Sequence, residues 1–171
     1  LKELKKEPVT LTAYQYSAQP SRSLSLAQED GVLDTITTNL SDFSTCNMIF
    51  LCAPVQKNID YLAQLKHIIS SDCLLTDVGS VKSDIHAKIT ELGLDHCFIG
   101  GHPMTGSEKT GYEHSNTLLL ENAYYILTPT AQTKPADLDY YTALVKTMGA
   151  IPIVLDPAEH DKITAAISHV P

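Results

Sequence analysis

The sequence of 171 residues contains no run of lysine and arginine and no long apolar stretch. Its net charge is -8, so neither a nucleic acid nor an anionic membrane surface is an expected partner. A membrane-spanning helix needs roughly 20 consecutive apolar residues, and no segment approaches that length. No signal-peptide pattern opens the sequence either. We therefore expect a protein that binds neither nucleic acid nor membrane.

Closely spaced cysteine pairs of the kind that bind zinc are also missing. The four cysteines are Cys46, Cys52, Cys73 and Cys97, and the histidines are scattered, so we expect no metal site. Three of the cysteines lie in or beside apolar, strand-like runs. Buried free thiols are typical of a reducing compartment, which predicts a cytoplasmic protein.

What the sequence does contain is a regular alternation of strand and helix patterns. Apolar or alternating runs predict strands over 9–16, 47–53, 73–78, 97–99, 123–128 and 151–155. Helical spacing predicts helices over 21–30, 58–70, 82–92 and 136–148. This order favours an α/β fold with a doubly wound, mainly parallel sheet of the Rossmann type.

Polar or glycine-bearing turns follow several of the expected strands. They contain Ser17, Ala53-Pro54, Gly79-Ser80 and His102. In an open parallel sheet the ligand binds beyond the carboxyl ends of the strands, so these turns predict a binding site on that edge. We expect Gly100 and Gly101 to end the strand 97–99 and to leave His102 on a loop at the mouth of the sheet.

A last helix is expected after Asp156, which can cap it, with Pro157 in the first turn. At 100° per residue His160 and His169 point to opposite faces, so they cannot share a metal ion. We expect His160 to lie in an exposed polar stripe, with Ile163 and Ile167 packed beneath it. His169 is expected near the edge of the domain.

Three motifs together resemble the prephenate dehydrogenase family. They are DVGSVK at 77–82, GGHPM at 100–104 with GSEK at 106–109, and HD at 160–161 with SHVP at 168–171. They occur in the order and at the spacing of that family, and the resemblance covers the chain from Val9 onward. It implies oxidative decarboxylation of prephenate to 4-hydroxyphenylpyruvate, with hydride transfer to NAD or NADP, in tyrosine biosynthesis.

The same resemblance implies roles for individual residues. His102 would accept a hydrogen bond from the ring hydroxyl of prephenate and assist the loss of its proton. Ser80 would orient this hydroxyl and help to fix the imidazole, and His169 would lie at the substrate pocket. Three further residues would line the cofactor cleft, with Gly79 beside the nicotinamide; they are Ala53, Pro54 and Val55.

One departure from the family concerns the ends of the sequence. The family opens with a strand and a Gly-x-Gly-x-x-Gly turn, and no such turn occurs here. We therefore expect 1–155 to be an N-terminally truncated dinucleotide-binding domain, with a gap where the first strand would lie. Residues 156–171 would form a helix leading to a helical dimerisation domain, and the complete protein would be a homodimer. The chain alone could bind cofactor poorly and be inactive.

A second departure concerns cofactor choice. The family usually has an acidic residue at the end of the strand 9–16, where this sequence has Tyr16-Ser17, with Arg22 five residues later. A hydroxyl and a guanidinium suit the 2′-phosphate of NADP, although Arg22 could also be a solvated residue of the first helical turn. NAD and NADP both remain open.

Three other functions compete with this interpretation. Arogenate dehydrogenase differs only in the amine of the substrate side chain, and no motif excludes it. Another Rossmann-type reductase acting on a small acid would not need the GGHPM run. A non-catalytic remnant with a binding role would agree with the missing phosphate turn, but it would have little need of His102 and Ser80.

Overall fold

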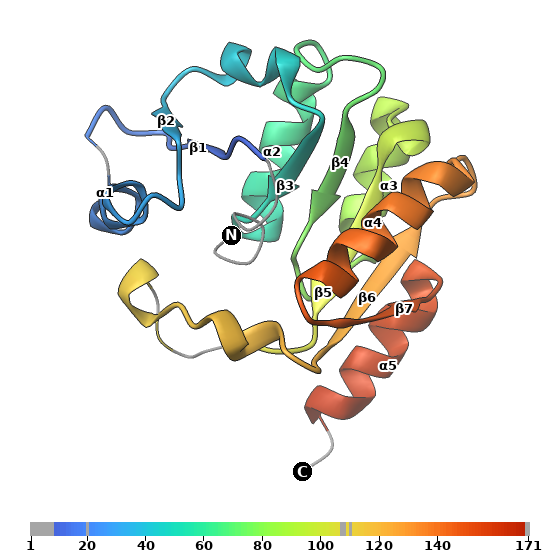
Figure 1. Ribbon diagram of the computed structural model, residues 1–171. Coiled ribbons are helices and arrows are strands. Elements are labelled where there is room, and N and C mark those ends of the chain that lie inside the picture. The colour runs from blue at the N-terminus through green and yellow to red at the C-terminus, as the bar shows by residue number, and fades with distance from the viewer. Residues whose placement is uncertain (1–8, 20, 107–108, 110, 170–171) are drawn as a thin grey trace.

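The computed structural model describes residues 9–19, 21–106, 109 and 111–169, the side chains of 168 and 169 excepted (Figure 1). The strands are β1 (Thr12–Tyr14), β2 (Thr35–Thr37), β3 (Met48–Leu51), β4 (Leu74–Asp77), β5 (Ile99–Pro103), β6 (Tyr124–Pro129) and β7 (Ile151–Val154). The α-helices are α1 (Arg22–Glu29), α2 (Val55–Leu65), α3 (Ser83–Leu92), α4 (Pro135–Thr147) and α5 (Pro157–His169). Short 3₁₀ helices are η2 (Leu40–Thr45), η3 (Asp95–Cys97), η4 (Tyr112–His114) and η5 (Thr117–Leu120).

The central strands form the expected α/β sheet. β3 pairs with β4 in parallel, and a parallel bridge between Leu75 and Phe98 links β4 to the start of β5. β6 pairs antiparallel with β5 and parallel with β7. In the connection from β5 to β6 the described residues form the short helices η4 and η5, and they include no α-helical crossover of the kind that usually returns the chain to a parallel strand. The carboxyl ends of β6 and β7 therefore lie on the edge opposite to those of β3 and β4.

β1 and β2 form a separate parallel pair. No strand that the structure describes pairs with both β1 and β3, and a cavity of about 430 Å³ lies between them, lined mainly by apolar side chains of both strands. Figure 1 shows the two groups of strands standing apart. The described strands therefore leave the gap that the sequence predicted.

Two apolar clusters cover the two faces of the sheet. On one face, Leu62 and Leu65 of α2 and Ile85 and Ile89 of α3 pack in one cluster against the sheet. On the other face, α4 contributes buried side chains that pack with Ile99 and Leu127. Figure 1 shows α2 and α3 behind the sheet and α4 in front of it. Among the described residues, no helix combines the length and the apolar character that crossing a bilayer requires.

Two details of the sequence interpretation are wrong. The sequence pattern missed β2, a strand of only three residues. The paired glycines do not end a strand, because β5 continues through them to Pro103 and His102 pairs with Ile126 inside the ladder. His102 therefore lies in a strand and not on a loop. The glycines are needed there for close packing, as the site shows.

Candidate functional site

The two glycines of β5 lie where a side chain would collide with its neighbours. A Cβ on Gly101 would lie 2.6 Å from the hydroxyl of Tyr141 and 2.7 Å from the carbonyl oxygen of Asp77. A Cβ on Gly100 would meet His86 and Lys82 on the α3 side of the sheet. Successive residues of a strand alternate between its faces, so His102 projects to the same side as Gly100. The strand thus directs the imidazole of His102 toward α3 and α5.

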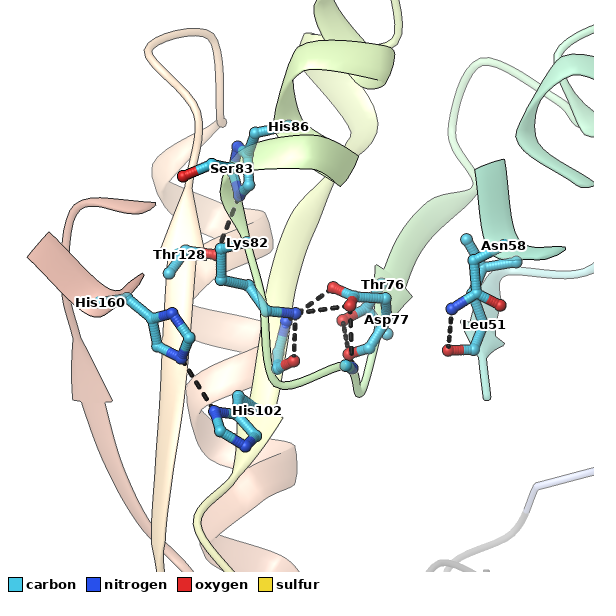
Figure 2. A network of polar contacts seen from close by, with 12 residues as sticks. Leu51, Asn58, Thr76, Asp77, Lys82, Ser83, His86, His102, Thr128 and His160 are labelled. Atoms are coloured by element: carbon cyan, nitrogen blue, oxygen red, sulfur yellow. Dashed lines mark hydrogen bonds and ion pairs between the residues drawn. The ribbon is translucent and has the colours of Figure 1, made fainter. Parts of the chain in front are cut away.

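His102 begins a chain of hydrogen bonds that leads into α5. Its Nδ1 lies 2.8 Å from Nε2 of His160, and Nδ1 of His160 lies 2.8 Å from Oδ1 of Asp161. Figure 2 shows the two imidazoles facing each other across the gap between β5 and α5. Nε2 of His102 has no hydrogen-bond partner among the described residues. One nitrogen of the ring is therefore held in place and the other is available to a ligand.

Asp161 is anchored at the start of α3. Its carboxylate accepts hydrogen bonds from the backbone N–H of Lys82 at 2.7 Å and of Ser83 at 2.8 Å, and also from the Ser83 hydroxyl. Partial burial would raise the pKa of Asp161, but these hydrogen bonds outweigh it and lower the pKa to about 2. The carboxylate is therefore ionised at neutral pH and acts only as an acceptor.

The imidazole of His102 is neutral at physiological pH. Burial disfavours its charged form, and the nearby His160 and Lys82 add to this effect, so the pKa falls to about 4. A neutral imidazole with one free nitrogen can accept a proton from a ligand hydroxyl. This arrangement is that of a general base.

A buried ion pair supports the turn between β4 and α3. Nζ of Lys82 donates to Oδ2 of Asp77 and, at 2.7 Å, to the carbonyl oxygen of Gly101 (Figure 2). The carboxylate of Asp77 also accepts from the backbone N–H of Gly79 at 2.9 Å. Burial raises the pKa of Asp77 and lowers that of Lys82, while the attraction between their charges opposes both shifts. The pair ties the 78–81 turn to β5, beside His102.

Ser80 and Gly79 lie in that turn. Ser80 is exposed, and its hydroxyl has no hydrogen-bond partner among the described residues. The imidazole of His102 is held by His160, and not by Ser80. A Cβ on Gly79 would lie 3.0 Å from Oδ2 of Asp77 and 3.3 Å from a methyl group of Val55, so the glycine lets the turn approach the start of α2.

The residues expected in the cofactor cleft lie where β3 leads into α2. Ala53 lines the cavity between β1 and β3, Pro54 is the cap of α2, and Val55 is its first residue. The buried side chain of Asn58 fixes this turn, because it accepts from the backbone N–H of Ala53 and donates to the carbonyl oxygen of Leu51 (Figure 2). The sequence analysis missed this role of Asn58; a polar residue at a buried helical position was the available signal.

Ser17 and Arg22 lie between the end of β1 and the first turn of α1. The hydroxyl of Ser17 donates to the carbonyl oxygen of Gln19 at 2.7 Å. Arg22 is the first residue of α1, and its side chain is 83% exposed, with Nε 3.9 Å from a carboxylate oxygen of Glu113. Such a contact is weak, so the guanidinium is free to turn toward a ligand.

His169 is the last residue of α5, and its side chain lies outside the described residues. The expectation for His160 was wrong, because its side chain is completely buried between β5 and α5. The exposed residues of α5 instead include Ile163 and Ile167, which were expected to pack. In the part of the chain that the structure describes, no group of three or more metal-ligating side chains is present.

Comparison with known proteins gives consistent matches. A profile of the family described as "prephenate dehydrogenase, nucleotide-binding domain" matches residues 2–154. The curated prephenate dehydrogenase of Lactococcus lactis subsp. cremoris is 37% identical over 149 residues, which cover 85% of this chain and 40% of that protein. The chain therefore spans less than half the length of that relative.

Solved structures agree with these matches. The arogenate dehydrogenase of Synechocystis has a TM-score of 0.87 at 33% identity, covering 98% of this chain and 58% of that one. The prephenate dehydrogenase of A. aeolicus, in complex with hydroxyphenyl propionate and NAD+, has a TM-score of 0.87 at 31% identity and covers 98% of this chain and 59% of that one. These likenesses extend over almost the whole described fold.

Proposed function

The chain belongs to the prephenate dehydrogenase family, whose nucleotide-binding domain it matches, and on that premise we propose the reaction of the complete protein. The complete protein oxidises prephenate to 4-hydroxyphenylpyruvate with release of carbon dioxide, in tyrosine biosynthesis. The observation that carries this proposal is the neutral imidazole of His102, with Nδ1 bonded to His160 and Nε2 available. It is the group that the oxidation of a ring hydroxyl requires.

His102 acts as the general base. Its Nε2 accepts a hydrogen bond from the ring hydroxyl and takes the hydroxyl proton as the ring carbon becomes a carbonyl. When bound, the nicotinamide cofactor supplies the acceptor for the hydride that leaves the same carbon. The bond to the ring carboxylate breaks, its electron pair completes the aromatic ring, and carbon dioxide departs. Formation of the aromatic ring provides the driving force.

Ser80 and His169 complete the proposed substrate site. The hydroxyl of Ser80 is exposed on the turn after β4, and the ion pair between Asp77 and Lys82 joins that turn to β5. Ser80 would orient the ring hydroxyl of the substrate toward His102. His169, at the end of α5, would contribute to the substrate pocket.

The cofactor is NAD or NADP. Support comes from a pocket that is lined by both Tyr16 and Ala53. Tyr16 follows β1 and Ala53 follows β3, so the pocket lies between the two groups of strands. Pro54 and Val55 are at the start of α2, and Val55 lies next to Gly79, which has no side chain to obstruct a ring. We propose that these residues hold the nicotinamide half, while Ser17 and Arg22 contact the adenosine ribose.

Three further properties belong to the proposal. Residues 1–155 form the dinucleotide-binding domain, and 156–171 lead toward a helical domain through which the complete protein forms a homodimer. We place the protein in the cytoplasm, supported by the free cysteines, of which Cys73 and Cys97 are buried.

Arogenate is a second candidate substrate, because the arogenate dehydrogenase of Synechocystis has the same fold at 33% identity. The test is the absorbance of reduced nicotinamide in the complete protein, with prephenate or arogenate as substrate and NAD or NADP as cofactor. A rise with prephenate is expected. A rise with arogenate alone would replace the substrate, and no rise in any of the four mixtures would reject the enzyme in favour of a non-catalytic binding role.

A further inference from the structure

The hydrogen bonds of His160 determine which ring nitrogen carries the proton when the imidazole is neutral. Asp161 is an ionised carboxylate whose oxygens can only accept, and one of them lies 2.8 Å from Nδ1 of His160. The proton of a neutral His160 is therefore on Nδ1. Its Nε2 then carries a lone pair and must act as an acceptor.

The same reasoning passes to the next ring. Nδ1 of His102 lies 2.8 Å from Nε2 of His160, and two acceptors cannot hydrogen-bond to each other. Nδ1 of His102 must donate, so it carries the proton of that ring. The remaining nitrogen of His102, Nε2, is then unprotonated.

We propose that His160 and Asp161 are positioning residues that hold His102 in the tautomer whose Nε2 can accept the hydroxyl proton of the substrate. This inference rests on the proposed function for the reaction, but the tautomer itself does not depend on any substrate. During the reaction the substrate O–H bond breaks and an Nε2–H bond forms on His102. The proton on Nδ1 stays in place, and no proton passes to Asp161.

The hydrogen-bonded series His102, His160 and Asp161, called the relay below, is held rigidly by its surroundings. His160 is completely buried, and Asp161 is held by the backbone N–H groups of Lys82 and Ser83 and by the Ser83 hydroxyl, so its carboxylate cannot turn away. The hydroxyl of Thr164 lies 3.4 Å from Nε2 of His160 and can donate to the same acceptor. The ionised carboxylate of Asp161, at 2.8 Å, is a stronger acceptor than the Thr164 hydroxyl at 3.4 Å, so the proton of His160 stays on Nδ1.

Charge also favours the relay. When His102 gains a proton, the imidazolium donates through Nδ1 to His160, and the negative charge of Asp161 lies one ring beyond. The negative charge of Asp161 raises the pKa of His102, although burial, the largest effect, lowers it. Asp161 therefore stabilises the protonated form of His102 that arises in the reaction, as an aspartate does in a Ser-His-Asp triad.

The direct test is nuclear magnetic resonance of the complete protein labelled with ¹⁵N-histidine, with His102→Asn used to assign the signal. At neutral pH we expect His102 to be protonated on Nδ1 and unprotonated on Nε2. In Asp161→Asn the amide can donate toward His160, and we expect a large part of the His102 population to move to the other tautomer. A wild-type His102 protonated on Nε2 would overturn the proposal.

Kinetics provide the second test, with Glu159→Gln as the matched control. Glu159 is an exposed residue of the same helix, so this control removes the same charge without touching the relay. We expect Asp161→Asn to lower kcat roughly 10- to 100-fold with little change in KM, and Glu159→Gln to leave both unchanged. Equal kcat in the two variants would refute a role for Asp161.

The tautomer measurement separates this inference from the proposed function. If neither prephenate nor arogenate is oxidised but the expected tautomer is found, the relay stands and the reaction is wrong. If the reaction occurs but His102 carries its proton on Nε2, the relay is wrong and the reaction stands. The measurement on the wild-type protein also remains decisive if Asp161→Asn does not fold.

Discussion

Lys82 and Asp77 form an ion pair in which both side chains are completely buried. Two backbone groups of β5 complete the pair, since the carbonyl oxygen of Gly101 accepts from Lys82 and the N–H of Gly101 donates to Asp77. The pair therefore joins the end of β4, the start of α3 and the strand that carries His102. The ion pair therefore fixes the position of β5 beside the candidate site, and it also contributes to the stability of the fold.

Lys82→Met tests this contribution. It leaves the Asp77 carboxylate buried without its partner, and we expect the free energy of unfolding to fall by about 3–5 kcal/mol, measured by urea denaturation. The double variant Asp77→Asn/Lys82→Met removes the uncompensated charge and should lose less. Lys57→Met, which breaks an exposed pair with Asp60, is the control and should cost less than about 0.5 kcal/mol. Similar losses in Lys57→Met and Lys82→Met would contradict this account.

Gly101→Ala tests the close packing of β5. The new methyl group would meet the carbonyl oxygen of Asp77 at 2.7 Å, and backbone cannot move aside as a flexible side chain can. We expect a loss of about 1–3 kcal/mol in the free energy of unfolding. A Cβ on Gly106 would meet nothing within 4 Å, so Gly106→Ala is the matched control and should be nearly neutral. Thermal unfolding of the two variants gives the comparison.

The arrangement of the strands could largely be predicted from the sequence, because continuous apolar runs such as Met48–Leu51 have one stable place in an α/β protein. The direction of β6 could not, since strand patterns carry no direction. The role of Gly100-Gly101 was also out of reach, because the atoms that exclude a side chain there belong to residues distant in the sequence, such as Asp77 and Tyr141. Local signals place a strand but do not say what packs against it.

The candidate site shows the same limit. The sequence predicted polar turns on one edge of the sheet, and it predicted His102 on a loop there, whereas His102 lies near the end of β5. The burial of His160 was not predicted, because a histidine on a helix looks like a solvent-exposed residue when the residue that packs against it is unknown. That residue is His102, which lies 58 residues away in the chain. The HD pair at 160–161 was visible only as part of the family resemblance.

His102→Asn tests the general base. Asparagine cannot take up a proton at neutral pH, so we expect kcat to fall roughly 100- to 10,000-fold, while the affinity for the cofactor changes little. Steady-state kinetics and cofactor titration measure the two effects. His114→Asn replaces an exposed histidine of η4 and should leave kcat unchanged. An unchanged turnover in His102→Asn would remove the proposed role.

Acid should destabilise the protein through two partly buried histidines. Burial, with a further effect of Lys82, lowers the pKa of His86 and of His102 from 6.5 to about 4. Between pH 6.5 and 4 the unfolded chain binds more protons than the folded chain, so the free energy of unfolding falls as the pH is lowered through this range. Urea denaturation at a series of pH values measures the slope.

Two variants assign part of that slope to His86. His86→Gln has no titrating group at this position and should flatten the fall in stability. Thr128→Val removes the hydrogen-bond partner of His86 but keeps the imidazole, so it should lower stability while preserving the slope. An unchanged slope in His86→Gln would show that other groups cause the acid sensitivity.

We expect the choice between NAD and NADP to depend on Arg22. Its guanidinium is exposed and lies 3.9 Å from Glu113, so it can reach a 2′-phosphate by giving up only a weak contact. If it binds that phosphate, Arg22→Ala should weaken NADP binding roughly 10- to 100-fold and leave NAD binding nearly unchanged, because NAD lacks the phosphate.

Glu113→Gln should leave NADP binding equal or tighter, since it removes the competing carboxylate. Lys88→Ala, which removes a cation from α3, is the control for net charge. Calorimetric titration of the complete protein with each cofactor provides the measurement. Equal losses for both cofactors in Arg22→Ala would mean that the guanidinium does not read the 2′-phosphate, and the selectivity would then have to come from Ser17 and its neighbours at the end of β1.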